Sequence, residues 1–307
     1  VLSDQGKYVE AESLVRDALE IAEEFDGLNS PRTNMFVANL AAVLNEQGKR
    51  DEAAPLYRRA WMAFRRELGD KHVMTLKQAN ILGVVHWQNG EFEEAIRVFK
   101  KVLTDGEGVW KPDNPQRLES LLNLAINYRE AKRFDSAIHV LEEMLTLPLP
   151  APMAQDCRNE WLEDLMLGRR GEKFEAWTNA EIQRQRDAKV PPPILAGQLV
   201  SAGIGFVRME QWDKAEPLLR ECVELRRKNM PGTWNTFYAI SALGEVQFRL
   251  GATEEAEALL LEGGQGIESA TFPESMVASG EAKRRRIEAY RRLIDFYESS
   301  SNQDAAQ

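Results

Sequence analysis

The chain alternates between segments with helical apolar spacing and short glycine-marked breaks, and residues 88–103 show this pattern most clearly. Gly90 ends one segment and Phe92 opens the next. In the second segment, Ala95, Phe99 and Val102 are spaced so that they fall on one face of an α-helix. The pattern therefore predicts two consecutive helices joined by a tight turn.

The same pattern returns along the chain at a nearly fixed spacing, and an alanine marks each copy. The marker alanines are Ala11, Ala53, Ala95, Ala137, Ala215 and Ala256. The first four are each 42 residues apart. A constant period of this size indicates a stacked array in which each unit packs on its neighbours. We therefore predict an all-α solenoid of antiparallel helix pairs, with about 14 or 15 helices and no sheet.

The residues around the marker alanines resemble the tetratricopeptide repeat. A small residue lies twelve positions before the alanine and a large apolar residue four positions after it, as in Gly83, Ala95 and Phe99. The 42-residue period resembles the kinesin light chain type of repeat, and the loops at 68–75 and 111–115 are similar to the Pro-Asp-His-Pro-type loop of that subfamily. The resemblance implies a right-handed superhelical solenoid whose first helices line a concave groove.

The last third of the chain looks like the repeat tail of planctomycete-type bacterial Ser/Thr protein kinases. The residues that carry this resemblance are Pro191-Pro192-Pro193 and the segment 230–237, MPGTWNTF. It implies the scaffold or recruitment region of a larger bacterial signalling protein. Because the chain has no kinase signature motif and begins at Val1 without methionine, we expect it to be a fragment whose catalytic domain lies elsewhere.

Four segments are expected along the chain. They are regular repeats at 1–147, a divergent repeat with a proline-bounded connection at 148–193, further repeats at 194–270, and a capping helix with a frayed tail at 271–307. In the divergent repeat the marker position falls on Ala176 or on Trp177, and both registers stay open. The glycine-rich run 263–266 is expected to be a flexible loop. The last helix, at about 274–299, should place Ile287, Tyr290, Ile294 and Tyr297 on one face and serve as a cap.

Charge and cysteine content narrow the functional classes. The formal net charge of −10 argues against a nucleic-acid-binding protein, which needs a basic face. The basic clusters at 226–228 and 283–286 are interpreted as solvated helix faces. Cys157 and Cys222 form no CxxC pair, and we expect reduced structural thiols and a cytoplasmic location. No run of 18 apolar residues exists that could span a membrane.

Residue patterns that support catalysis are missing from the sequence. His72, His86 and His139 form no metal-ligand motif, and the glycine run lacks the GK[ST] ending of a phosphate-binding loop. We therefore expect no enzyme activity, no catalytic residue, no metal and no cofactor.

The inner face of the predicted array is the candidate binding surface. Positions 15, 14, 11, 8 and 7 residues before each marker alanine lie on the inner face of a first helix. The candidates are Asn39, Asn45, Asn80, Trp87, Gln88, Asn123, Arg129, Glu130, Arg208, Phe248 and Arg249. The asparagines can hydrogen-bond an extended peptide backbone, or they can bridge neighbouring helices. Trp87 offers an aromatic anchor.

Non-catalytic binding of a peptide or protein segment in the groove is the favoured function. Neither nucleic acid nor a membrane is an expected partner. The alternative is a purely structural or self-association spacer. An enzyme with an unrecognised site is the least favoured reading.

Overall fold

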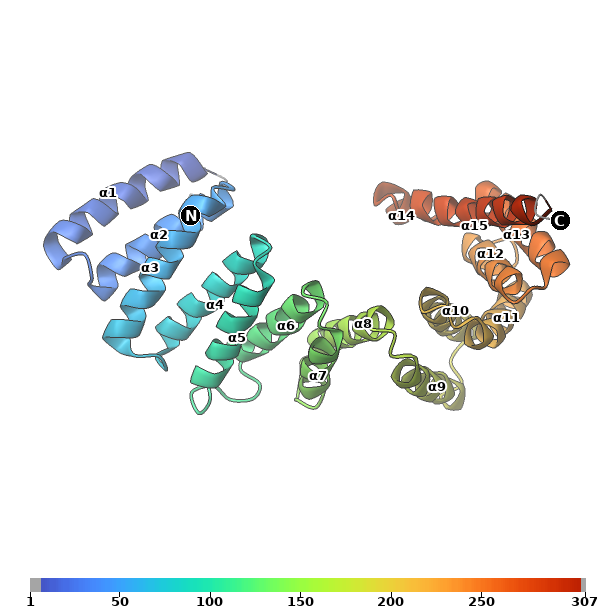
Figure 1. The fold of residues 1–307 in the computed structure, drawn as a ribbon, viewed down its shortest axis with the longest axis horizontal. Coiled ribbons are helices and arrows are strands. Elements are labelled where there is room, and N and C mark those ends of the chain that lie inside the picture. The colour runs from blue at the N-terminus through green and yellow to red at the C-terminus, as the bar shows by residue number, and fades with distance from the viewer. Residues whose placement is uncertain (1–6, 305–307) are drawn as a thin grey trace. The chain divides into compact units, whose positions relative to one another are not determined.

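The computed structural model describes residues 7–304, and the side chains of residues 7–299. All regular structure in this part of the chain is helical, which confirms the predicted all-α class (Figure 1). The helices are α1 Tyr8–Asp26, α2 Pro31–Glu46, α3 Arg50–Leu68, α4 Val73–Gln88, α5 Phe92–Asp105, α6 Pro115–Glu130, α7 Phe134–Leu145, α8 Ala151–Leu167, α9 Gly171–Asp187, α10 Pro192–Arg208, α11 Trp212–Asn229, α12 Trp234–Arg249, α13 Thr253–Ser269, α14 Glu274–Ala278 and α15 Glu281–Asp304. Of the expected frayed tail, residues 305–307 lie outside the described residues.

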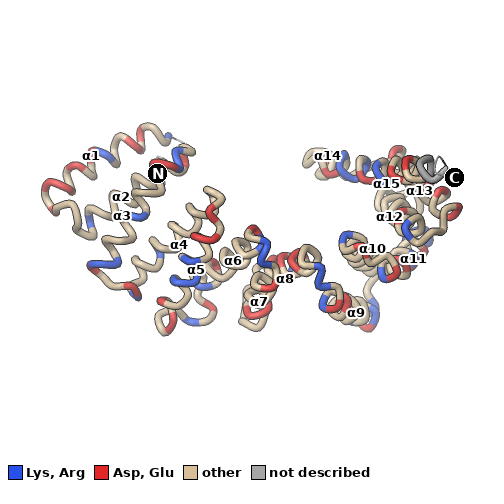
Figure 2. Tube along the Cα trace, in the orientation of Figure 1, with Lys and Arg blue, Asp and Glu red and all other residues tan. Residues whose placement is uncertain are grey.

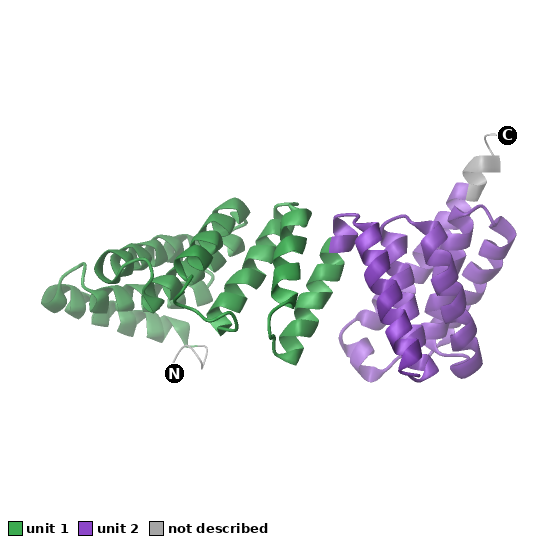
Figure 3. Cartoon of the chain, turned by 90° about the horizontal axis from the view of Figure 1, so that it is seen from below, with its two compact units in different colours: residues 1–164 green, residues 165–307 purple. Residues whose placement is uncertain are grey.

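The chain forms two compact units, residues 1–164 and residues 165–307 (Figure 3). The boundary falls inside α8, between Asp164 and Leu165. In unit 1 the helices pack as consecutive pairs, α2 with α3, α4 with α5 and α6 with α7. In unit 2, α10 pairs with α11 and α12 pairs with α13, while α15 packs on both α12 and α13.

Small residues hold the helices of each pair close together. The marker alanines of α3, α5, α7, α11 and α13 are fully buried. A Cβ atom added at Gly83 of α4 would come 2.7 Å from Cζ of Phe99 in α5, so only a glycine accommodates the ring there. The predicted small-residue and large-residue positions therefore meet across the pair.

The register of the divergent repeat is neither of the two expected. In the regular repeats the marker alanine is the fourth residue of the second helix, as Ala95 is in α5. In α9 that position is Phe174, which is buried, and the large-residue position four residues later is Thr178. The large and small residues have exchanged places, and a pattern based on alanine therefore missed this repeat.

The glycine-rich run 263–266 is part of α13 and does not form the predicted loop. A Cβ atom at Gly263 would lie 2.6 Å from the backbone nitrogen of Ser241, and one at Gly266 would lie 2.0 Å from Cδ1 of Phe237. The glycines thus let α13 approach α12 more closely than any side chain would allow. Their helical propensity is poor, and the close packing on α12 outweighs it.

The C-terminal helix does not bury the apolar face that contains Ile287 and Ile294. Ala282, Ala289 and Phe296, spaced seven residues apart, are buried, whereas Ile287 and Ile294 are exposed. Tyr297 is also exposed, and Tyr290 is half-buried. The predicted single helix is divided into α14 and α15, with Gly280 between them at a φ of +75°.

Candidate functional site

In unit 1, the predicted inner-face residues of α4 and α6 lie on neighbouring first helices that contact each other. Trp87, in the last turn of α4, leaves 41% of its surface exposed. Val84, one turn earlier, and Ile81, two turns earlier on the same face, are half-buried. This part of α4 therefore presents an apolar surface with a large exposed aromatic ring at its end.

Asn80 has a structural role in the fold. It is only 7% exposed, and its Oδ1 atom accepts a hydrogen bond of 3.0 Å from the hydroxyl of Ser120 in α6. The hydroxyl of Ser120 also donates to the carbonyl of Gln116. Asn80 therefore ties α4 to α6, as the helix-bridging alternative for the asparagines predicts, and a partner has little access to it.

The other amide side chains of the predicted groove are more open. Asn39 on α2 is exposed, and Asn45, Gln88 and Asn123 are half-buried. The oxygens Oδ1 of Asn45 and Oε1 of Gln88 are nevertheless buried, and they have no hydrogen-bond partner among the described residues. Asn39 of α2 and Asn123 of α6 occupy equivalent positions in the repeats on either side of α4. Both leave polar groups available on the first-helix face.

Arg129 is engaged within the chain. Its guanidinium forms an ion pair with Glu160 of α8 and lies 3.7 Å from Oδ1 of Asp164, which is 1% exposed. Burial raises the pKa of Asp164 to about 7, and the positive charge of Arg129 opposes that rise. Arg129 thus joins α6 to α8, while its neighbour Glu130 stays exposed.

In unit 2 the predicted residues have different surroundings. The ring of Phe248 packs at 5.0 Å, edge to face, on Phe296 of α15, so the C-terminal helix covers it. The guanidinium of Arg249 lies 5.7 Å from the rings of Trp212 and Phe248. Arg208 is exposed and lines a cavity of unit 2. Phe248 is half-buried and packs against the core of unit 2, so only part of its ring is open to a partner.

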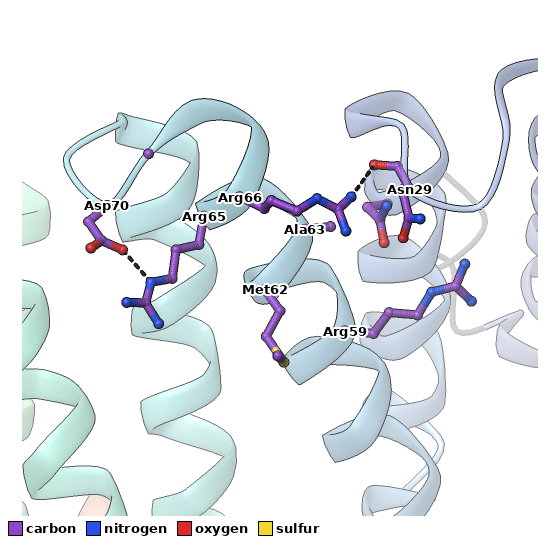
Figure 4. Close-up of a pocket in the computed structure, with 9 residues that line it drawn as sticks. Asn29, Arg59, Met62, Ala63, Arg65, Arg66 and Asp70 are labelled. Atoms are coloured by element: carbon purple, nitrogen blue, oxygen red, sulfur yellow. Dashed lines mark hydrogen bonds and ion pairs between the residues drawn. The ribbon is translucent and has the colours of Figure 1, made fainter.

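A cavity of about 680 Å³ lies along α3, on the second helix of a pair, where no binding residue was predicted (Figure 4). Met62, which is 59% exposed, lies between Arg59 and Arg65, and Arg66 points toward Asn29. The arginines already have partners: Arg59 binds Glu23, Arg65 binds Asp70, and Arg66 donates to the Asn29 carbonyl. The sequence signal was two Arg-Arg pairs seven residues apart, a spacing that puts them on one helix face.

Charged residues of both signs are interspersed along the helices of each unit (Figure 2). No three His, Cys, Asp or Glu side chains of the described residues are grouped to hold a metal ion. None of the described helices combines the length and apolar character needed to cross a membrane.

Both cysteines are buried free thiols. Burial raises the pKa of Cys157 and that of Cys222 to about 11 in each case. Neither thiol is therefore an activated nucleophile at neutral pH, because the reactive form is the thiolate.

The tetratricopeptide repeat family model matches residues 31–107 and 79–147. Among curated proteins, the clustered mitochondria protein homolog of Candida albicans is 26% identical over 143 residues, which are 47% of this chain and 10% of that protein. The homolog of Meyerozyma guilliermondii is 24% identical over 135 residues, 44% of this chain and 11% of that protein. The chain thus spans about a tenth of the length of these relatives.

Solved structures with similar folds share little sequence with this chain. A tetratricopeptide repeat protein from Parabacteroides merdae is 16% identical, with 94% of each chain covered and a TM-score of 0.47. Kinesin light chain TPR-like repeats from Podosopora anserina are also 16% identical, covering 77% of this chain and 96% of that one with a TM-score of 0.36. From the repeat frame and the family match together, the chain contains tetratricopeptide repeats, which the family model places at residues 31–147.

Proposed function

We propose that the chain is a non-catalytic protein–protein interaction module that binds a peptide or protein segment on the first-helix face of unit 1. The observation that carries the proposal is the exposed ring of Trp87 beside the half-buried Ile81 and Val84. Exposed aromatic residues at the edge of an apolar surface are the residue type that dominates binding energy at many protein interfaces.

The polar side chains around Trp87 give this surface its expected specificity. Asn39 and Asn123 carry both donors and acceptors, which suits the alternating N–H and C=O groups of an extended peptide backbone. Asn80 and Arg129 are left out of the contact surface, because their polar groups are bound within the chain. Glu130, which is exposed at the end of α6, favours a segment with a basic residue at that point.

The context of the module is part of the same proposal. A repeat array of this kind would recruit or hold a partner for a larger protein, and the resemblance of residues 190–307 to bacterial kinase tails suggests a cytoplasmic signalling protein. The alternative is a spacer that self-associates, which the exposed apolar residues Ile287 and Ile294 on α15 favour.

The test is selection of peptides from a displayed random library on the folded chain, followed by fluorescence polarisation with the selected peptides. The variant Trp87→Ala/Asn123→Ala should weaken binding roughly 30-fold or more, as expected for an interface anchor. Its melting temperature should change little, because both side chains are partly exposed. The matched control is Phe25→Ala, which removes an aromatic ring that is 80% exposed on α1 and should leave binding unchanged.

Equal affinity of the wild type and the double variant would rule out this surface. If no peptide is selected and light scattering gives a concentration-dependent mass, the self-association alternative is supported instead.

A further inference from the structure

Arg226, near the C-terminal end of α11, is the one residue of its basic cluster that the solvated-face interpretation does not fit. It is only 5% exposed, whereas the neighbouring Arg227 is open to solvent and binds Glu262 at 2.5 Å. Arg220, two turns earlier, binds Glu216 and Glu255. Arg226 forms no ion pair with any carboxylate of the described residues, and its Nη1 donates only to the carbonyl of Asn235.

A buried guanidinium without a counter-charge is energetically unfavourable. Nε of Arg226 has no hydrogen-bond partner among the described residues. Burial also lowers the pKa of Arg226 below its ordinary value. Because taking an unpaired charge out of water is costly, the fold of unit 2 retains Arg226 at the expense of stability. A bound anion would neutralise the charge of Arg226 and accept its unused hydrogen bond.

Arg226 lines a cavity of about 280 Å³ among α10, α11, α12 and α15. Arg208 and Arg285 line the same cavity, and no acidic side chain does so among the described residues. Trp234 and Tyr238 form aromatic parts of the wall, and Ser201 adds a hydroxyl. The cavity therefore combines three guanidinium groups with aromatic surface.

The half-buried Arg285 of the same cavity has only some of its donors satisfied. Arg285 pairs with Glu281 and Glu288 on its own helix, and its Nη1 donates to the Tyr238 hydroxyl at 3.0 Å. Nε of Arg285, like that of Arg226, has no partner among the described residues. The cavity along α3 differs in this respect, because its arginines are bound to Glu23, Asp70 and the Asn29 carbonyl. The unit 2 cavity thus contains two arginines, Arg226 and Arg285, whose Nε atoms have no acceptor among the described residues.

We infer that this unit 2 cavity is a binding site for a phosphate group, held by Arg226 at its base with Arg285 and Arg208 around it. A phosphate carries close to two negative charges at neutral pH and several strong acceptor oxygens, so it can satisfy more than one guanidinium. A carboxylate carries one negative charge, about half that of a phosphate, and is therefore a weaker match for this site. The site does not rest on the function proposed for unit 1, since all its residues belong to unit 2.

The test is thermal unfolding of the full chain in sodium phosphate, sodium acetate and sodium chloride at equal ionic strength. Phosphate should raise the melting temperature of the wild type in a saturable manner, and the other two salts should not. Arg226→Met should abolish the phosphate-specific rise. It should also leave the melting temperature in chloride unchanged or higher, because a buried unpaired charge is replaced by an apolar chain of similar length.

Arg227→Met is the matched control, because it removes the adjacent arginine that is exposed and already paired; the phosphate effect should persist in it. Should Arg226→Met fail to fold, Arg208→Gln changes only an exposed side chain at the cavity and should weaken phosphate binding about tenfold. A wild type without a phosphate-specific rise, or a folded Arg226→Met that keeps the full rise, would overturn the site.

The source of the phosphate is settled by titrating a phosphoserine pentapeptide and its unphosphorylated form alongside inorganic phosphate. Binding of the phosphopeptide that is lost in Arg226→Met identifies a phosphorylated segment as the ligand. Binding of inorganic phosphate alone identifies a free anion. If short duplex DNA binds with equal strength to the wild type and Arg226→Met while inorganic phosphate does not bind, exposed arginines are responsible and the site is refuted.

Discussion

The ring of Phe174 lies against the backbone of Gly205, on the next helix along the chain: a Cβ atom at residue 205 would come 2.3 Å from Cζ of the ring. The same ring packs at a centroid distance of 5.0 Å, nearly perpendicular, on Phe206. Phe174 occupies the place where every other well-marked repeat has an alanine. The glycine on α10 supplies the space that the alanine would otherwise have left.

Gly205→Ala is therefore expected to destabilise unit 2 by about 1–3 kcal/mol, because the added methyl group meets a buried ring that has little room to move. The comparison is Gly197→Ala on the same helix, where a Cβ atom meets nothing within 4 Å. That variant should be neutral or more stable by up to about 1 kcal/mol, as for glycine replaced by alanine in a helix. Urea denaturation measures both.

A double-mutant cycle tests the coupling of the two residues. Phe174→Leu should recover part of the stability lost in Gly205→Ala, since the smaller side chain makes room for the methyl group. Additive effects of the two substitutions would contradict the contact.

Gly266→Ala is expected to separate α13 from α12 and to lower the free energy of unfolding by about 1–3 kcal/mol or more, because the added Cβ atom would overlap the ring of Phe237. Gly264→Ala, two residues earlier, places its Cβ atom 3.7 Å from Leu293, an ordinary contact. It should not destabilise the chain. Equal effects of the two substitutions on the melting temperature would refute the close approach.

The buried carboxyl of Asp164 gives unit 1 a pH dependence. Its pKa is raised to about 7 by burial, so the folded chain holds a proton that the unfolded chain releases above about pH 4. The contribution of this carboxyl to the free energy of unfolding is thus largest at low pH, falls as the pH rises through about 7, and is constant above that. Arg129, Glu160 and Glu163 set the charge around it.

In urea denaturation between pH 5 and pH 8, Asp164→Asn should flatten the fall in stability that the wild type shows in this interval. Asp156→Asn, an exposed position on the same helix, should keep the wild-type slope. A slope unchanged by Asp164→Asn would show that the group is ionised in the folded chain.

The two thiols should react slowly with a thiol reagent such as DTNB at pH 8 while the chain is folded. Both are buried, and burial raises the pKa of each to about 11, so little thiolate is present. Unfolding in urea should release two fast-reacting thiols. Rapid labelling of one thiol in the native chain would show local opening around that residue.

Sequence periodicity alone determined the helical class, the pairing of helices and the burial of the marker alanines, because these follow from local spacing that repeats every 42 residues. It also placed Trp87 on the first-helix face, since a helix fixes which residues share a side. The sequence could not show that Phe174 replaces an alanine, that residues 263–266 are helical, or that α15 buries Ala289 and Phe296 in place of Ile287 and Ile294. In each case packing on another helix outweighs local propensity.

The same physical reason applies to charge. In the sequence, Arg226 and Arg227 are neighbours in one basic cluster, and both are predicted to be solvated. In the tertiary structure, Arg227 is open to water beside Glu262, and Arg226 is buried without a carboxylate partner among the described residues. The placement of α10, α12 and α15 around α11 determines which of the two side chains is removed from solvent. Burial of a charge depends on neighbours distant in sequence, so it emerges only when the helices are assembled.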